Sequence, residues 1–453
     1  MSIKTLQGDN RETLATLPES SIHMAVTSPP YWALRSYLPA DSPLKGFELG
    51  QEPTPELFIE NLVDVFRSVR RVLRDDGTLW VNLGDSYAAS GMGGNPEESE
   101  HRKQATNAGS LISGRKPAEG LKPLDRVGIP ERFALAMQQD GWYWRDVIVW
   151  RKPAPMPISV NGWRWEKCRV KVKGKYGPDN PHPSKTNGIN YDRGNDAPSA
   201  VWSDCPGCKK CDKNDGYVLR KGSWRTTAAH EYIFMFAKTA SYFCDAEAMK
   251  VPSNPAYADR EHKPKGSFNG KLDDANSGNP NKAFRAVSPS ANPRSVWTIN
   301  TEPLKAKHYA AFPSELPRRC IRAGTPDKGC CPECGAPWAR IVDKTRTATR
   351  PGNDTKITGD RMNDGNRDAQ RHVSESRTVG WRPTCGCDAG EPVPCVVLDP
   401  FGGSGTTGLV GQMMGRDVVL CELNPEYIDI QRDRCEETAP LLLSVESTPT
   451  GTE

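Results

Sequence analysis

Residues 395–407 read CVVLDPFGGSGTT, a short apolar run followed at once by a turn with three glycines. The apolar run has the length and composition of a buried strand, and a helix is expected from about Thr406. Gly402, Gly403 and Gly405 let the backbone turn tightly and approach a ligand with no Cβ in the way. In open α/β sheets, ligands bind at the carboxyl ends of the strands, where this turn would lie. The segment therefore predicts a ligand-binding loop in an α/β fold.

The residues around the turn limit the kind of ligand it can bind. No lysine follows Gly405, so the segment is not a phosphate-binding P-loop, and the dinucleotide-binding spacing does not fit either. Asp399 would repel a phosphate but suits a cationic ligand, such as the sulfonium or ammonium group of S-adenosylmethionine. Glu422 follows Asp399 by 23 residues, at the end of the next expected strand, where an acid can hydrogen-bond ribose hydroxyls.

Other segments of the chain carry strand and helix patterns. Strands are expected at 22–27, 78–83, 147–150, 232–236, 395–398 and 418–421. Residues 57–73 follow helical spacing, and this helix is expected to end near Gly77. Strands that alternate with helices predict a doubly wound, mainly parallel α/β sheet.

The composition indicates a globular protein with much loop structure. Of 453 residues, 40 are glycine and 39 are proline, and 36% are hydrophobic. No apolar run is long enough to cross a membrane, and residues 1–10 lack the pattern of a secretory signal. We therefore expect a cytoplasmic protein that does not contact a membrane.

A second specific pattern follows the first expected strand, where residues 27–32 read TSPPYW. Two prolines fix φ and remove two backbone donors, which leaves a rigid turn that presents carbonyl oxygens and the Ser28 hydroxyl. These acceptors suit an exocyclic amine of a base, which offers two N–H donors. Tyr31 can stack on a base taken out of the helix, since a paired base cannot otherwise reach a buried pocket.

Both segments resemble motifs of amino-methylating DNA methyltransferases, namely Asp-Pro-Phe-x-Gly-Ser-Gly-Thr-Thr for the cofactor and Asp/Asn/Ser-Pro-Pro-Tyr/Phe for catalysis. The resemblance implies a methyltransferase fold that uses S-adenosylmethionine. It implies the catalytic residues Ser28, Pro29, Pro30 and Tyr31. The implied cofactor-binding residues are Asp9, Thr27, His308, Phe312, Pro313, Asp399, Pro400, Phe401, Gly403, Ser404, Gly405, Thr406, Glu422 and Asn424.

The order of the two motifs resembles the permuted beta group of this family, in which the catalytic turn comes first and target recognition lies between the two. Weaker matches to that group occur at 8–9, 76–80, 150–153 and 307–313. A serine before Pro-Pro-Tyr resembles the enzymes that methylate cytosine N4, whereas adenine N6 enzymes more often carry Asp or Asn. The resemblance therefore implies cytosine N4 first and adenine N6 second.

Fourteen cysteines in a chain without an export signal indicate metal binding rather than disulfides. The first expected ligand set is Cys205, Cys208 and Cys211 with Cys168 or, alternatively, His182. The second is Cys331, Cys334, Cys385 and Cys387, in which Cys330 could replace Cys331. Because each set can supply four protein ligands, we expect one or two structural zinc ions. The alternatives are unliganded thiols and, for the first set, an iron–sulfur cluster.

These patterns predict the following organisation. The core is expected at 1–158 (with a flexible insertion at 86–122), 223–241, 299–328 and 391–436, the last binding the cofactor. A cysteine insertion is expected at 159–222, target recognition at 242–298, a zinc ribbon with a polar loop at 329–390, and a frayed tail at 437–453. The polar stretches 254–294 and 343–382 lack apolar periodicity and are expected to be loops or disordered.

The sequence thus predicts a site-specific methyltransferase of double-stranded DNA that flips its target base, in a bacterial, archaeal or phage-encoded protein. A cognate restriction endonuclease is a candidate partner. Basic residues at 164–175 and 260–294 are candidate DNA contacts. The alternatives are an RNA or protein amino-methyltransferase, and a zinc-bearing DNA-binding module without activity.

Overall fold

The computed structural model describes residues 2–88, 118–155, 162–172, 201–253, 290–303, 312–348, 372–388, 390–438 and 445–449. The chain divides into two compact units. One comprises residues 1–154 and 230–453, and the other comprises residues 155–229.

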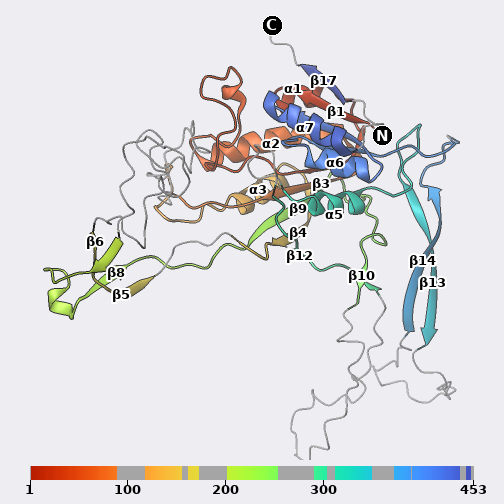
Figure 1. Cartoon of the computed structure of the whole chain (residues 1–453). Helices are drawn as coiled ribbons and strands as arrows, with labels where there is room; N and C mark the ends of the chain where they lie inside the picture. Colours follow the sequence, from red (N-terminus) through yellow and green to blue (C-terminus); the bar gives the residue numbers. More distant parts are fainter. Residues whose placement is uncertain are drawn as a thin grey trace, which may run out of the picture. The chain divides into compact units, whose positions relative to one another are not determined.

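The larger unit is built on one sheet of nine strands (Figure 1). In spatial order they are β12 (Val296–Thr298), β4 (Tyr143–Arg151), β9 (His230–Ala237), β3 (Leu73–Leu83), β2 (Ile22–Thr27), β15 (Val396–Asp399), β16 (Asp417–Glu422), β1 (Ile3–Gln7) and β17 (Val445–Pro449). Neighbouring strands are parallel, except that β9 is antiparallel to both β3 and β4. The expected mainly parallel sheet is confirmed.

Helices cover both faces of this sheet. One core contains side chains of α1 (Asn10–Ala15), α2 (Pro55–Val72) and α3 (Ile129–Gln139). The other contains side chains of α5 (Glu315–Gly324), α6 (Thr406–Met413) and α7 (Pro425–Thr438). Along β16 the buried residues alternate between the two cores, because successive side chains of a strand point to opposite faces. The sheet is therefore doubly wound, as expected, and Figure 1 shows the C-terminal helices (blue) beside the N-terminal strand β1 (red).

Helix α2 ends earlier than the sequence predicts. Its last residue is Val72, and Leu73 is already extended (φ −71°, ψ 136°) and begins β3. Gly77, expected to stop the helix, lies inside β3 instead. A Cβ on Gly77 would come within 2.8 Å of the Leu73 side chain and 2.9 Å of the His23 carbonyl oxygen. A glycine is required there by close packing, which a sequence rule for helix ends does not distinguish from a helix stop.

Three segments expected outside the core or without structure form strands. Residues 296–298, expected in the recognition region, form β12 on the edge of the core sheet, where the Trp297 ring stacks on Trp80 at 6.5 Å. Within the expected tail, β17 pairs with β1. The polar stretch from 343 contributes to the hairpin β13 (Trp338–Ala348) and β14 (His372–Pro383). Backbone hydrogen bonds to a neighbouring strand hold each of these segments. Apolar periodicity in the sequence therefore does not predict them as strands.

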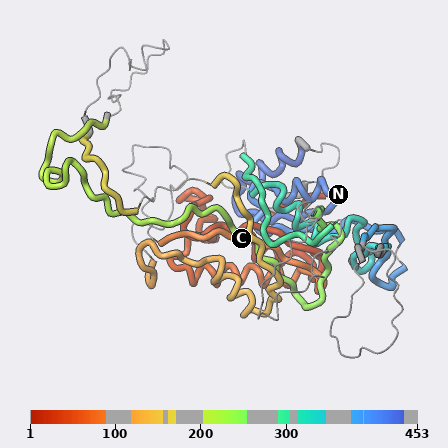
Figure 2. The backbone as a smooth tube through the Cα atoms, turned by 90° about the horizontal axis from the view of Figure 1, so that it is seen from below, coloured from red at the N-terminus to blue at the C-terminus, as the bar shows by residue number. Residues whose placement is uncertain are grey.

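The smaller unit consists of short antiparallel ribbons, traced in yellow and green in Figure 2. Strand β5 (Trp163–Lys167) pairs with β8 (Tyr217–Lys221), and β6 (Arg169–Val172) pairs with β7 (Val201–Asp204). The other short elements within the described residues are the 3-10 turns η1 (Lys45–Phe47) and η4 (Asp212–Asn214) and the strands β10 (Val251–Pro252) and β11 (Ser290–Ala291). Within the described residues, no helix is both long and apolar enough to span a bilayer.

Candidate active site

Three neighbouring strands bring the two sequence motifs together. Strand β15 lies between β2 and β16 and is parallel to both. Their carboxyl ends therefore meet at one edge of the sheet, where β2 leads into the turn at 28–31, β15 leads into the glycine turn, and β16 ends at Glu422. This is the edge at which open α/β sheets bind ligands.

The carboxylate of Asp399 joins the two turns. Thr27 Oγ1 donates a hydrogen bond of 2.5 Å to Asp399 Oδ1, and Thr407 Oγ1 donates one of 2.6 Å to Oδ2. The backbone N–H of Phe401 also donates to Oδ1 at 3.0 Å. Burial raises the pKa of Asp399 to about 6, although the three donors favour the ionised form. Asp399 is thus a buried carboxyl group that titrates close to neutrality.

The carboxylate of Glu422 closes the other side of the glycine turn. Its Oε2 accepts from the backbone N–H of Gly403 at 2.7 Å, and its Oε1 accepts from that of Asn424 at 2.8 Å. Burial raises the pKa of Glu422 to about 7, against the effect of these donors. Gly403 and Gly405 have φ of +51° and +77°, a region that favours glycine. A half-buried carboxylate beside such a turn fits a ligand with vicinal hydroxyls.

Several expected cofactor residues have partners within the protein. Asp9 caps α1, and its carboxylate binds Arg11 at 2.7 Å. The Ser404 and Thr406 hydroxyls both accept from Arg434 of α7, at 2.9 and 3.2 Å. These side chains therefore have clear roles in shaping the turn.

The remaining expected cofactor residues lie around the same edge. Asn424 caps α7 and binds the Tyr37 carbonyl at 3.0 Å, and the Pro400 carbonyl accepts from Asn10 at 3.3 Å. Phe401 and Phe312 are half-buried against the cores on opposite faces of the sheet, and Phe312 and Pro313 directly precede α5. His308 lies outside the described residues.

The turn at 28–31 ends in a polar cluster that the sequence did not predict. Tyr31 donates its hydroxyl proton to Glu231 Oε2 at 2.7 Å, and Asn82 Nδ2 donates to the Tyr31 oxygen at 2.7 Å. Glu231 is also paired with Lys152. Burial, together with the charge of Glu231, raises the pKa of Tyr31 well above its usual value. The ring of Tyr31 packs on Gly84, where a Cβ would come within 2.6 Å of it.

The residues missed at this edge carried weak local signals. Asn82 is a polar residue within the apolar strand run 78–83, and Glu231 directly precedes the run 232–236. Two further residues hold the glycine turn. Thr407 binds Asp399, and Gln431 Nε2 donates to the Gly403 carbonyl at 2.8 Å. Only their position in the fold distinguishes these residues from other polar residues.

The first cysteine cluster comprises Cys168, Cys205, Cys208 and Cys211, whose sulfurs all lie within 4.8 Å of one another. Cys208 Sγ lies 3.9 Å from Cys168 Sγ and 3.6 Å from Cys211 Sγ. Four thiolates at about 2.3 Å from one zinc ion would be about 3.8 Å apart. Backbone N–H groups of Lys210 and Cys211 lower the pKa of Cys208 to about 7. The cluster therefore fits zinc, and the alternative ligand His182 lies outside the described residues.

The second cysteine cluster comprises Cys331, Cys334, Cys385 and Cys387, again with all sulfurs within 4.8 Å. Arg74 Nη1 donates to the Cys334 carbonyl at 2.7 Å, and His23 contacts the Gly335 carbonyl at 3.0 Å. The cluster is thereby fixed to the start of β2 and β3.

Cys330, the alternative ligand of the second cluster, faces His23 and Cys395 instead. Both ring nitrogens of His23 are engaged, since Nδ1 accepts from the Val396 N–H at 3.0 Å and Nε2 faces Gly335. This third group therefore lacks a free imidazole ligand.

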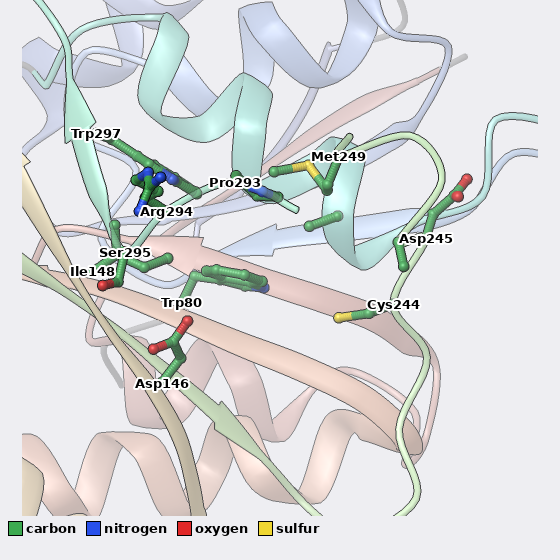
Figure 3. Close-up of a pocket in the computed structure, with 12 residues that line it drawn as sticks. Trp80, Asp146, Ile148, Cys244, Asp245, Met249, Pro293, Arg294, Ser295 and Trp297 are labelled. Atoms are coloured by element: carbon green, nitrogen blue, oxygen red, sulfur yellow. The ribbon is translucent and has the colours of Figure 1, made fainter. Parts of the chain in front are cut away.

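A separate cavity of about 160 Å³ lies on the α5 face of the sheet (Figure 3). Its lining includes Trp80, Asp146, Cys244 and Trp297. Cys244 follows the carboxyl end of the antiparallel β9, so the cavity lies toward the amino ends of the parallel strands. It is not part of the edge that holds the two turns.

Comparison with known proteins finds matches over both turns. A family model described as DNA methylase (N6_N4_Mtase) matches residues 22–331 and 394–433. The chain is 29% identical to the Type II methyltransferase M.SmaI of Serratia marcescens, over 96% of this chain and 90% of that protein. It is 29% identical to the Type II methyltransferase M.Cfr9I of Citrobacter freundii, over 95% of this chain and 86% of that protein. The solved PvuII DNA methyltransferase (cytosine-N4-specific) is 14% identical, with a TM-score of 0.44 over 96% of this chain and 86% of that one.

The raised pKa values of Asp399 and Glu422 predict how stability depends on pH without a ligand. Between the pKa of an unfolded carboxyl group, about 4, and the folded values of about 6 and 7, the native state binds more protons than the unfolded state. The free energy of unfolding should therefore fall as pH rises through this window. Glu422→Gln should reduce that fall, as measured by denaturant unfolding at several pH values.

The exposed Asp429 of α7 offers a matched control, and Asp429→Asn should keep the dependence of the wild type. An equal fall in the wild type and in Glu422→Gln would contradict the assignment.

Proposed function

Because the chain belongs to the DNA methylase family, which transfers methyl groups from S-adenosylmethionine to amino groups of DNA bases, we propose that it methylates cytosine N4 in double-stranded DNA. The observation that carries this proposal is the hydrogen bond between Thr27 and Asp399, which holds the Ser-Pro-Pro-Tyr turn against the glycine turn. A serine at position 28 favours cytosine over adenine, by the resemblance of this turn to those of cytosine N4 enzymes.

The glycine turn and its two acids would bind the cofactor. S-adenosylmethionine, when bound, supplies a methyl carbon on a positively charged sulfur, which keeps the electron pair of the broken carbon–sulfur bond. Asp399 places negative charge near that cation, although its own oxygens are shared with three donors. Glu422 would accept hydrogen bonds from the ribose hydroxyls. Phe401 and Phe312 would form apolar walls of the cofactor pocket.

The turn at 28–31 would bind the target amine. The Ser28 hydroxyl or the carbonyl oxygen of Pro29 accepts an N–H group of the amine, which helps to orient the nitrogen lone pair toward the methyl carbon. The amine nitrogen forms the new bond to carbon and releases one proton to solvent. Holding the two reacting atoms close and in line supplies much of the acceleration. No cysteine nucleophile is required, because the exocyclic nitrogen attacks directly. The base reaches this turn only after it leaves the duplex.

Adenine N6 is the second candidate substrate, because its amine offers the same two donors and the matching family model covers both N6 and N4 enzymes. RNA and protein amines are more distant alternatives. The order of the turns along the chain supports placement in the permuted beta group, with target recognition between them. A cognate restriction endonuclease is the proposed partner.

We further propose that each cysteine cluster holds one structural zinc ion. The sulfur separations of the first cluster and the thiol-only ligand sets support closed tetrahedral sites. The first zinc would fold the unit of residues 155–229, whose described surface carries Arg164, Lys167 and Arg169 as candidate phosphate contacts. The second would fix the base of the β13–β14 hairpin.

Methylation of unmethylated genomic DNA, followed by mass spectrometry of the nucleosides, tests the reaction. The wild type should yield 4-methylcytosine. Asp399→Ala and Tyr31→Ala should each lower the yield by about 100-fold or more, because each misplaces a reacting group. Asp429→Ala, at an exposed position on α7, should match the wild type. A 6-methyladenine product would assign the adenine alternative. The absence of both methylated bases would overturn the proposal that DNA is the substrate.

Metal analysis tests the two zinc sites. The purified wild type should contain about two zinc ions per chain. Cys208→Ser and Cys334→Ser should each remove about one, because each breaks a different shell. Cys244→Ser, a thiol outside both clusters, should leave the zinc content unchanged. Zinc content that does not respond to either cluster substitution would contradict the assignment.

A further inference from the structure

The polar cluster beside Tyr31 contains a buried atom without a partner. Asn82 is only 1% exposed, and its Oδ1 has no hydrogen-bond partner among the described residues. A buried carbonyl oxygen without a donor destabilises the protein, because nothing replaces the hydrogen bonds that it made to water. An unpartnered buried atom at the sheet edge that carries the two turns requires an explanation. A bound ligand with a hydrogen-bond donor would provide the missing partner.

The orientation of the Asn82 amide is fixed by its other atom. Asn82 Nδ2 donates to the Tyr31 oxygen at 2.7 Å and to Glu231 Oε2 at 2.9 Å. Rotating the amide by half a turn would place Oδ1 against the Glu231 carboxylate, where two acceptors would repel each other. Oδ1 is therefore held as the free acceptor of the cluster.

The position of Asn82 places this acceptor next to the catalytic turn. Strands β2 and β3 are paired in parallel with Thr27 opposite Val81, so Ser28 and Asn82 follow one position further along. Asn82 Nδ2 donates to the Tyr31 oxygen, and Ser28 lies beside the same hydroxyl group. Asn82 also shares a face of β3 with Trp80, because the two are separated by two positions, and that face is the one covered by α5. Phe312 and Pro313 of the expected cofactor pocket directly precede α5.

The charged members of the cluster are already occupied. Glu231 Oε2 accepts from Tyr31 and Asn82, and Glu231 Oε1 is paired with Lys152. Lys152 also lies 4.6 Å from the ring centre of the buried Trp150. The ion pair with Lys152 on one oxygen and the two hydrogen bonds on the other together fix the Glu231 carboxylate in place. Glu231 and Lys152 thus act through Asn82 and Tyr31, as positioning residues.

We propose that Asn82 Oδ1 accepts a hydrogen bond from the exocyclic amine of the target base, and that Glu231 and Lys152 hold it in position. This inference rests on the proposed amino-methyltransferase function. It adds Asn82, in β3, as a catalytic residue beside the turn at 28–31. Ser28 or Pro29 accepts one N–H of the amine, and Asn82 accepts the other. The nitrogen gains positive charge as it forms the bond to carbon, so the contact to Oδ1 strengthens during the reaction.

Steady-state kinetics of full-length variants on unmethylated DNA test the role of Asn82. Asn82→Ala should lower kcat by about 100-fold while KM for DNA and Kd for S-adenosylmethionine stay within about twofold. Glu231→Gln and Lys152→Met should lower kcat by about 10-fold, again without raising KM. Asn82→Ala with kcat within about threefold of the wild type would overturn the proposal, as would a change confined to KM or Kd.

Trp142 provides the matched control for a buried polar atom. Its Nε1 also has no hydrogen-bond partner among the described residues, but Trp142 lies just before β4, at the opposite edge of the sheet. Trp142→Phe should keep the kcat of the wild type. An equal loss of kcat in Trp142→Phe and Asn82→Ala would mean that burial alone explains the effect and would overturn the proposal.

An exchange of the two groups separates a catalytic contact from a structural one, even if Asn82→Ala does not fold. In the double variant Asn82→Asp/Glu231→Gln, the carboxylate moves to position 82 and the amide to position 231, so the net charge is unchanged. The amide introduced at position 231 then donates to one oxygen of the carboxylate at position 82, and the other oxygen faces the amine. The exchange should recover at least about 10-fold of the kcat lost in Asn82→Asp alone, and no recovery would overturn the proposal. A wild type that labels no DNA would instead overturn the proposed function itself.

Discussion

The hydrogen bond from Thr27 to Asp399 joins residues that are 372 positions apart. The arrangement of the sheet edge that carries the two turns depends on this bond. Thr27 ends β2 and Asp399 ends β15, and these strands are neighbours in the sheet. The bond therefore fixes the distance between the turn proposed to receive the amine and the turn proposed to bind the methyl donor. Reactions that join two bound groups are sensitive to displacements of about 1 Å, so the proposed reaction should depend on this contact for its rate as well as for stability.

The rest of the edge extends outward from this bond on both sides. On one side, Glu422, Gln431 and Arg434 hold the glycine turn in a shape that favours glycine at 403 and 405. On the other side, Asn82, Glu231 and Lys152 hold Tyr31. The antiparallel strand β9 is essential here, because its reversed direction brings its first residues, including Glu231, to the carboxyl edge of the parallel strands.

The two turns, Asp399 and Glu422 could be predicted because their chemistry lies in contiguous residues with specific spacing. The cluster around Asn82 could not be predicted. Its members lie in β3 and β9 and directly after β2 and β4, and the order and direction of these strands appear only in the fold. Local rules also failed where packing decides the residue, as at Gly77, and where backbone pairing forms a strand without apolar periodicity, as in β14 and β17. The cysteine spacing predicted both sulfur clusters but left Cys330 and Cys331 as alternatives. The structure distinguishes them, because Cys331 lies in the second cluster and Cys330 lies with His23 and Cys395.

Calorimetric titration of S-adenosylmethionine into the wild type and Thr27→Val tests most directly whether this contact organises the active edge. The folded wild type should bind about one cofactor per chain. Thr27→Val removes the contact that positions Asp399 and the glycine turn, so the variant should bind the cofactor about 10-fold or more weakly, a loss of about 1.4 kcal/mol. Equal affinity in the two proteins, or a folded wild type that does not bind the cofactor, would contradict the account.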